Sequence, residues 1–407
     1  MATGNRGVPL KSFSGDRSPH RWRCTYLDLL AATKMRRFHT SSLRSFKQKV
    51  SETTKKSRTP NKQKGVEHRG VQKAIAHAGH SKSATEVPDL QILSKELTTG
   101  VFTYPEAIQA SLSNLGSFLP QQNNEAFRAH ASLIRPETVE LAKELLGSRK
   151  LVTGSIGIGK STVLSQAHAI AKLNGWAVVH IPRAMELIDG SNDHAFTSTG
   201  EILQPMYVKR LFKRILKANK DVLSTDAIGI LKSGDAAALP SVFDQLAKDN
   251  TKILLTCDGI NAWSHQPMSV NRTKDNMPIY HGDLQVPKLF LSYISGKAKL
   301  DGAVMAATTG IYKTNDSIRV AMKQAVSHSY AELEEFDPTL SEAFATVTEL
   351  PVSYMTLEET RIWMEYLSKA GIVAQNSDEL VKEAFTISGG NPRFLLRTFL
   401  NFGLKCI

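Results

Sequence analysis

The sequence has few cysteines and lacks long apolar runs, and each shortage excludes a class of protein. The three cysteines, scattered over 407 residues, suggest neither a disulfide framework nor a zinc site. Their small number suits a reducing compartment. No apolar run approaches the ~18 residues that a bilayer-spanning helix needs, so we expect no membrane partner. The cysteines are Cys24, Cys257 and Cys406.

Acidic residues are scarce in only one part of the chain. Residues 1–75 hold 18 lysines and arginines but only four acids, whereas the net charge of the whole chain is +13. The basic excess therefore belongs almost wholly to this first segment, and the remaining residues are close to neutral. Such asymmetry predicts that the N-terminal segment has functions of its own.

Residues 1–38 are predicted to be a mitochondrial transit peptide, which places the protein in the mitochondrial matrix. The stretch LDLLAATKMRRF, residues 27–38, gathers apolar residues on one helical face beside three cations. An amphipathic, Arg-rich, Ser-rich and acid-poor beginning is typical of such peptides. The following RRFHTSS resembles presequence cleavage sites, so we expect cleavage after Phe38. There are two alternatives: translation starts at Met35, or the segment is a disordered tail without a targeting signal.

Residues 39–86 are predicted to form a flexible basic arm. They are rich in Lys, Arg, His, Ser and Thr and poor in large apolar residues, so they cannot bury enough surface to fold alone. Basic arms bind nucleic acid by neutralising phosphates and releasing counterions. The arm has almost no aromatic residues, so we expect backbone contacts rather than base stacking. A solvated linker is the alternative.

A phosphate-binding loop follows an apolar strand and precedes a helix at residues 154–161. GSIGIGKS fits the pattern G-x-x-x-x-G-K-[ST]. Its glycines let backbone N–H groups turn toward a phosphate, and the helix directs its positive dipole end at the same anion. The lysine would reach the β- and γ-phosphates, and the serine would bind Mg²⁺. The predicted nucleotide-binding residues are Gly154, Ser155, Ile156, Gly157, Ile158, Gly159, Lys160, Ser161 and Thr162.

A second apolar strand, KILLTCDG at 252–259, ends in an acid. A strand that delivers Asp258 at its carboxyl end is the Walker B arrangement, in which the acid holds Mg²⁺ or its water across from Ser161. An aspartate that only caps a turn is the alternative. Many ATPases place a water-activating Glu next, but Gly259 stands here. We therefore expect nucleotide binding with weak or absent hydrolysis.

Alternating apolar strands and helices predict an α/β fold with a parallel sheet flanked by helices. The core is placed at 136–330, after a helical lead-in at 87–135 and before a helical C-terminal part at 331–407. Residues 263–287 are predicted to be a long loop of functional importance. The predicted core strands are 151–153, 176–182, 252–259 and 303–309.

Two further pairs of residues allow two interpretations each. Thr308 and Thr309 end a predicted strand and either sense a γ-phosphate or are ordinary strand-end residues. Arg393 and Arg397 lie one turn apart on the last predicted helix. One of them leans over the nucleotide, or both are surface residues.

Taken together, GSIGIGKS, GWAVVHIP, ILLTCDGINAW and GGNPRFLLRTF resemble the death-associated-protein-three family of small-subunit mitochondrial ribosomal proteins. The resemblance spans roughly residues 90–407 and implies a fold similar to AAA-type P-loop ATPases. It implies a subunit in the head of the small ribosomal subunit that binds GTP or GDP with Mg²⁺. The expected partners are small-subunit rRNA, neighbouring proteins and, through intersubunit bridges, the large subunit.

The choice of guanine rests on this resemblance alone. The guanine-reading motif Asn-Lys-x-Asp is absent from the sequence, so ATP remains an alternative ligand. Two other functions stay open from the residues. One is an active mitochondrial NTPase that acts as a switch or remodels RNA or protein. The other is an RNA-binding assembly factor that leaves the mature particle.

Overall fold

The computed structural model describes residues 91–92, 97–118, 130–326, 332–373 and 376–402. The predicted transit peptide with its cleavage site after Phe38, and the predicted basic arm at 39–86, lie outside the described residues. Among the described residues, no helix combines the length and apolarity needed to cross a bilayer.

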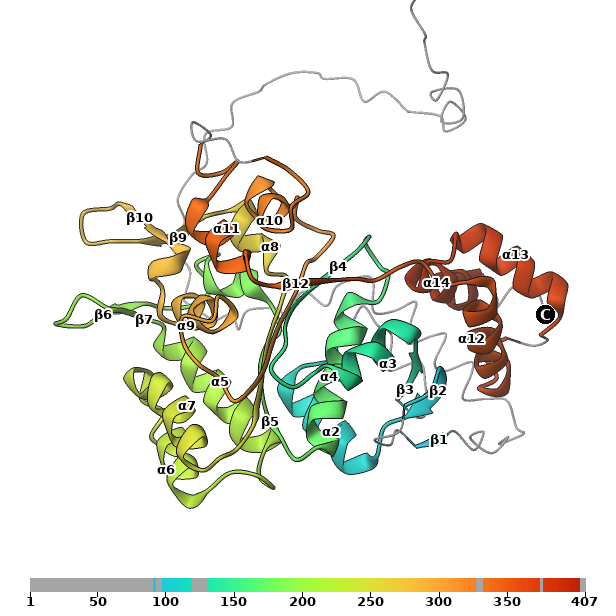
Figure 1. Cartoon of the computed structure of the whole chain (residues 1–407), viewed down its shortest axis with the longest axis horizontal. Coiled ribbons are helices and arrows are strands. Elements are labelled where there is room, and N and C mark those ends of the chain that lie inside the picture. Colours follow the sequence, from blue (N-terminus) through green and yellow to red (C-terminus); the bar gives the residue numbers. More distant parts are fainter. Residues whose placement is uncertain (1–90, 93–96, 119–129, 327–331, 374–375, 403–407) are drawn as a thin grey trace, which may run out of the picture. The chain divides into compact units, whose positions relative to one another are not determined.

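The centre of the fold is a sheet of five parallel strands (Figure 1). Its order is β12-β4-β11-β8-β5, so β4, which precedes the phosphate loop, is flanked by β11 and β12. This arrangement confirms the predicted α/β P-loop fold. The strands are β4 (Arg149–Thr153), β5 (Ala177–Ile181), β8 (Ile253–Asp258), β11 (Gly302–Ala307) and β12 (Thr348–Pro351).

Both faces of the sheet are covered by helices, which explains why its strands read as continuous apolar runs. On β8, Leu254 belongs to one buried cluster and Leu255 to another, because successive side chains point to opposite faces. Leu254 packs in a cluster with α2 (Glu106–Leu115) and α4 (Lys160–Leu173). In Figure 1 these helices lie on the opposite side of β5 from α5, α6 and α7.

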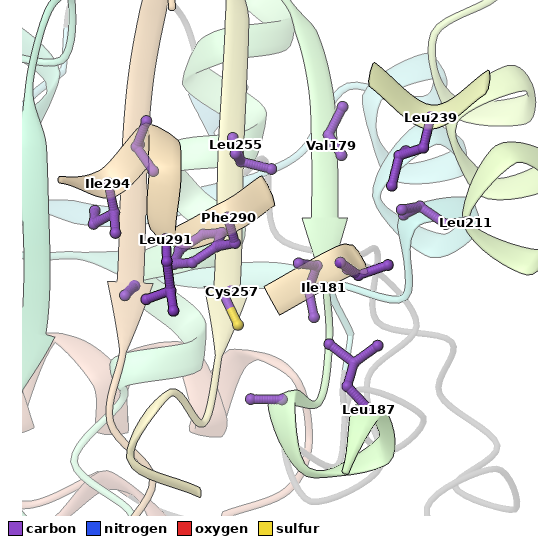
Figure 2. Packing of buried hydrophobic residues seen from close by; sticks show 14 of the residues in the cluster. Val179, Ile181, Leu187, Leu211, Leu239, Leu255, Cys257, Phe290, Leu291 and Ile294 are labelled. Atoms are coloured by element: carbon purple, nitrogen blue, oxygen red, sulfur yellow. The ribbon is translucent and has the colours of Figure 1, made fainter. Parts of the chain in front are cut away.

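Leu255 lies in the larger cluster, which joins the other face of the sheet to three helices. They are α5 (Pro205–Ala218), α7 (Leu239–Lys248) and α9 (Gln285–Ile294). Figure 2 shows members of this cluster from the sheet and from all three helices. Fully burying one such leucine contributes roughly 1.5–3 kcal/mol to stability, so the two clusters together fix the sheet between its helical layers.

The edge strand β5 is protected by one side chain. Asn219, directly after α5, accepts the Val178 N–H at 2.8 Å and donates to the Val178 carbonyl at 2.9 Å. The amide thus takes the place of a neighbouring strand at this residue. Covering an edge in this way prevents pairing with another chain.

The remaining elements surround this core. The helices α12, α13 and α14 share a third cluster, which includes Leu133 of β3. The other described elements are β1 (Gln91–Ile92), β2 (Gly100–Thr103), β3 (Ala131–Ile134), α3 (Pro136–Lys143), β6 (Ala195–Phe196), β7 (Ile202–Leu203), α6 (Thr225–Ser233), α8 (Asn261–His265), β9 (Met268–Arg272), β10 (Pro278–Tyr280), α10 (Asp316–Ala321), α11 (Pro338–Phe344), α12 (Leu357–Lys369), α13 (Asp378–Ser388) and α14 (Pro392–Phe402).

Three segments differ from the sequence-based expectation. The lead-in at 87–135 holds the strands β1, β2 and β3 besides its helix. The expected loop at 263–287 contains the end of α8, a hairpin of β9 and β10, and the start of α9. The tail at 331–407 contains β12, so the predicted limit at 330 separates this strand from the sheet that it completes. The domain limits otherwise stay a prediction.

Candidate functional site

The phosphate loop joins the end of β4 to the start of α4 and depends on its glycines. Gly154, Gly157 and Gly159 have φ angles of 140°, 77° and 109°, in the region that favours glycine. A Cβ on Gly157 would lie 2.8 Å from Arg393 Cβ. Gly159 caps α4 without any side-chain hydrogen bond to the helix, so the first N–H groups of α4 stay available to an anion.

Lys160 is held inside this loop. Its side chain is buried, and Nζ donates to the carbonyl oxygens of Gly154 and Ser155, both at 2.7 Å. Burial lowers the pKa of Lys160, while the nearby Asp258 acts in the opposite direction. The ammonium group therefore sits where a phosphate can replace the two carbonyls as its partner.

Ser161 and Asp258 meet across the end of the sheet. The Ser161 hydroxyl donates to Asp258 Oδ2 at 2.6 Å, although 97 residues separate the two. Burial raises the pKa of Asp258 to about 6, against the lowering effects of the Ser161 hydrogen bond, Lys160 and the Gly259 N–H. Hydroxyl and carboxylate oxygens are ligands that Mg²⁺ accepts. The two oxygens thus fit the Mg²⁺ site predicted from sequence.

This oxygen pair would need further ligands from the nucleotide. Among the described residues, no three or more His, Cys, Asp and Glu side chains gather into a metal-binding group. Mg²⁺ commonly uses one or two protein ligands together with substrate phosphates and water. The donor set therefore suits a metal that arrives with a nucleotide rather than a metal bound by the protein alone.

A cavity of about 530 Å³ opens over the loop, within the range of small-molecule sites. Of the predicted site residues it is lined by Ile156, Gly157, Ile158, Gly159, Lys160, Ser161, Thr162 and Asp258. Gly154 and Ser155 lie outside the lining and contribute the carbonyls that hold Lys160. The cationic lining residues are Lys160, Arg135, Arg183 and Arg393. Arg135 pairs with Glu137 and Glu359, and Arg183 pairs with Glu186, so Lys160 is the cation that the loop itself presents to an anion.

The lining offers little for hydrolysis. Among the described residues that line the cavity, Asp258 is the single carboxylate, and it is committed to Ser161. Gly259 has a φ of 78°, and its N–H bonds to the Ala307 carbonyl at 2.8 Å. A glutamate at this position would be strained. In this backbone conformation a water-activating glutamate directly after Asp258 would be unfavourable.

Both threonines predicted as possible sensors line the cavity, but their polar groups already have partners. The Thr308 N–H donates to the Val152 carbonyl at 3.0 Å, and its hydroxyl lies 3.4 Å from the same oxygen. The Thr309 N–H donates to Asn261 Oδ1 at 2.7 Å. Asn261 belongs to the DGINAW stretch and is fully buried. Its contact with Thr309 joins residues 48 positions apart, and the sequence alone did not reveal it.

The C-terminal part packs against the phosphate loop. An arginine of the last helix near the nucleotide was one of two expectations, but the contact made by Asn391 was not anticipated from the sequence. Asn391 Nδ2 donates to the Ile156 carbonyl at 2.8 Å, and the Arg393 N–H approaches the Gly157 carbonyl at 3.3 Å. Arg393 lines the cavity, whereas Arg397 is exposed and lies outside the lining. The asparagine in GGNPRF was the available signal.

Comparison with known proteins identifies the family to which the chain belongs. The family model described as mitochondrial ribosomal death-associated protein 3 matches residues 132–229 and 227–398. The small ribosomal subunit protein mS29 of Neurospora crassa is 28% identical over 76% of this chain and 77% of its own length. The protein of the same name from Schizosaccharomyces pombe is 25% identical over 72% of this chain and 69% of its own.

Among solved structures, the Walker-type ATPase PABY2304 of Pyrococcus abyssi has a TM-score of 0.40 at 12% identity, covering 66% of this chain and 67% of its own. The family match covers more than half of the chain, including the phosphate loop, Asp258 and the C-terminal residues that close the loop. The chain belongs to the family of mitochondrial ribosomal death-associated protein 3.

Proposed function

We propose that the protein is a structural component of the mitochondrial small ribosomal subunit that holds a guanine nucleotide with Mg²⁺. Two relatives named as small ribosomal subunit proteins support the ribosomal role. Under this proposal the protein works in the mitochondrial matrix, in contact with small-subunit rRNA and neighbouring proteins. Bridging to the large subunit is part of the proposal.

The observation that carries the nucleotide-binding part is the geometry at the start of α4. Uncapped N–H groups, a buried lysine and a serine–aspartate oxygen pair converge on one side of the cavity. These groups suit the phosphates and the metal of a nucleotide. They do not read the base, so guanine follows from the family resemblance.

We infer that the nucleotide is held rather than consumed. The cavity lining includes no second carboxylate among the described residues to activate water. A ligand present at 100 times its Kd stabilises the folded state by ~2.7 kcal/mol. The bound nucleotide would therefore act as a part of the fold that keeps the loop, β8 and the C-terminal residues together.

The test is to purify mitochondrial small subunits and identify the nucleotide that they retain. We expect about one GTP or GDP for each copy of the protein, removed together with Mg²⁺ by EDTA. Particles that contain the protein without any nucleotide would disprove the nucleotide part. Native protein that never sediments with small subunits would disprove the ribosomal part. Turnover of ~1 per second or faster would instead support an active NTPase.

A further inference from the structure

Helix α5 carries five cations and no acid over its fourteen residues, PMYVKRLFKRILKA. Its apolar face is buried in the larger core cluster. Its opposite face exposes Lys209, Lys213 and Lys217, and Lys220 follows the helix end, also exposed. We call these four residues the lysine face.

The spacing of the lysine face is unfavourable for the isolated helix. Lys209, Lys213 and Lys217 are four residues apart, so they lie above one another on one side of α5. Like charges at this spacing destabilise a helix by about 0.2–0.5 kcal/mol for each pair. The exposed side of α12 shows the usual solution, because Arg361 pairs with Glu358 at 3.0 Å and Lys369 with Glu365 at 2.6 Å.

Within the described part of the chain, no ion pair or hydrogen bond joins a side chain of the lysine face to another residue. Two acids that flank α5 in sequence are already engaged, and Glu201, the nearest acid before the helix, makes no ion pair with these lysines among the described residues. Asp193 accepts the Met206 N–H at 2.8 Å, and Asp221 pairs with Lys172 at 2.8 Å. The protein therefore does not neutralise this face itself.

The arginines of α5 behave differently. Arg210 is half-buried, donates to Asn192 Oδ1 and lies over the Tyr207 ring at 5.6 Å. Arg214 is also half-buried. The arginines thus face the protein, and the exposed lysines are the charges that remain for a partner.

We propose that the lysine face binds the phosphate backbone of double-helical RNA. At 1.5 Å for each residue, Lys209 to Lys220 span about 16 Å, long enough to contact several phosphates. No aromatic residue lies on this face, so stacking on unpaired bases is not available. The choice of RNA over other polyanions rests on the proposed ribosomal function.

The test uses the full chain and a fluorescent 20-base-pair RNA duplex of arbitrary sequence. The variant Lys209→Gln/Lys213→Gln/Lys217→Gln removes three charges and keeps good helix formers. We expect duplex affinity to fall about tenfold or more near 0.1 M salt. Each lost phosphate contact should also make the slope of log K against log salt shallower by about 0.7–0.9.

The matched control is Lys248→Gln/Lys288→Gln/Lys299→Gln, which removes three exposed lysines elsewhere. Both variants keep the basic N-terminal residues, so net charge and the contribution of that segment are equal. We expect the control to change duplex affinity less than twofold and to leave the salt slope unaltered. Equal melting temperatures and equal nucleotide affinities would show that both variants are folded.

Equal losses in the two triple variants would overturn the proposal, because general charge alone would explain them. Unchanged duplex affinity with reduced incorporation into small subunits would also overturn it and indicate an acidic protein partner. Nucleotide content is measured on the same samples, and sedimentation is measured on the unaltered chain. Failure of the lysine face is therefore distinguishable from failure of the proposed function.

Discussion

Helices α4 and α5 have the same length and both contain lysines, but they use them in opposite ways. Eleven of the fourteen residues of α4 are buried, whereas α5 buries one face and exposes its lysines. In α4 the polar side chains have defined partners. Lys160 bonds to the loop, Gln166 to Ser132 and Leu133, and Lys172 to Asp221.

The difference concerns what each kind of charge can recognise. A buried lysine with fixed neighbours selects a ligand by the position of individual oxygen atoms. A row of exposed lysines produces a positive electrostatic potential. This potential attracts phosphates in many different arrangements, and salt weakens it by screening. The comparison predicts that changes in α4 affect one small ligand strongly, whereas changes in α5 affect a large polyanion gradually.

The largest effect is expected from Lys160→Ala. Removing the ammonium group should weaken nucleotide binding about 100-fold, since a charged hydrogen bond contributes roughly 1.5–3 kcal/mol. Isothermal titration with GDP and Mg²⁺ measures the loss. Lys209→Ala on α5 is the control and should leave GDP affinity unchanged. Similar losses in both variants would remove the distinction between the two helices.

Gly157→Ala should destabilise the fold by about 2 kcal/mol. The new Cβ would lie 2.8 Å from Arg393 Cβ, and the backbone has a φ of 77°. Gly147→Ala is the matched control, with a φ of 74° and no atom within 4 Å of the added Cβ. It should cost only about 1 kcal/mol. Urea unfolding measures both, and equal costs would mean that contact with the C-terminal part is unimportant.

Ser161→Ala should weaken the binding of GDP about tenfold when Mg²⁺ is present and very little in EDTA. The substitution removes one of the two oxygens that converge at the end of β8, and a factor of ten corresponds to ~1.4 kcal/mol. The neighbouring Ser155→Ala serves as the control, because the Ser155 hydroxyl bonds to Tyr354 and not to Asp258. Equal losses with and without Mg²⁺ would contradict the metal site.

The buried histidines of the α4 side predict a loss of stability in acid. His168 bonds to Ser117 and Thr256, each at 2.8 Å, and burial lowers its pKa to about 3. Burial also lowers the pKa of His180 well below its usual value. Between pH 3 and 6.5 the unfolded chain binds more protons, so stability is present above pH 6.5 and falls as pH falls. The slope is up to ~1.4 kcal/mol per pH unit for each histidine.

His168→Gln should reduce this dependence of stability on pH by up to ~1.4 kcal/mol per pH unit, which corresponds to one bound proton. The reduction is expected whatever the effect of the substitution on stability at pH 7. Urea unfolding at several pH values between 5 and 7 measures the slope. His265→Gln changes an exposed imidazole and is the control. An unaltered slope in His168→Gln would mean that this histidine is not held neutral in the fold.

The smallest effect is expected from Lys213→Gln alone. One lost phosphate contact should lower RNA-duplex affinity only a few-fold and reduce the salt slope by about 0.7–0.9. Fluorescence anisotropy at four salt concentrations measures both quantities. A loss as large as that of the triple variant would show that a single lysine is read specifically, which would break the contrast with α4.

The sequence predicted the fold class and the phosphate loop because each has a local signal. The strands β5, β8 and β11 are buried on both faces, so they appear as continuous apolar runs. The loop is defined by glycines whose backbone angles other residues rarely adopt. Signals of this kind lie within a few neighbouring residues.

The structural features that the sequence did not predict depend on contacts between residues far apart in the chain, or on patterns too short to be recognised. The strand β12 has only four residues, with one buried, and ends in Pro351, so it becomes a strand only by pairing with β4. The hairpin of β9 and β10 alternates buried and exposed residues too briefly for a clear pattern. The bond from Asn391 to Ile156 joins residues 235 positions apart, which no local pattern reveals.

That long-range bond sets an order of events while the protein is being made. The phosphate loop is synthesised well before β12 and long before Asn391 and Arg393. Until those residues emerge, the Ile156 and Gly157 carbonyls lack the partners seen in the folded chain, and β4 is an edge strand. If the nucleotide binds as proposed, its firm retention would require a chain that extends through Arg393, so that truncated products are distinguishable from chains ready for assembly.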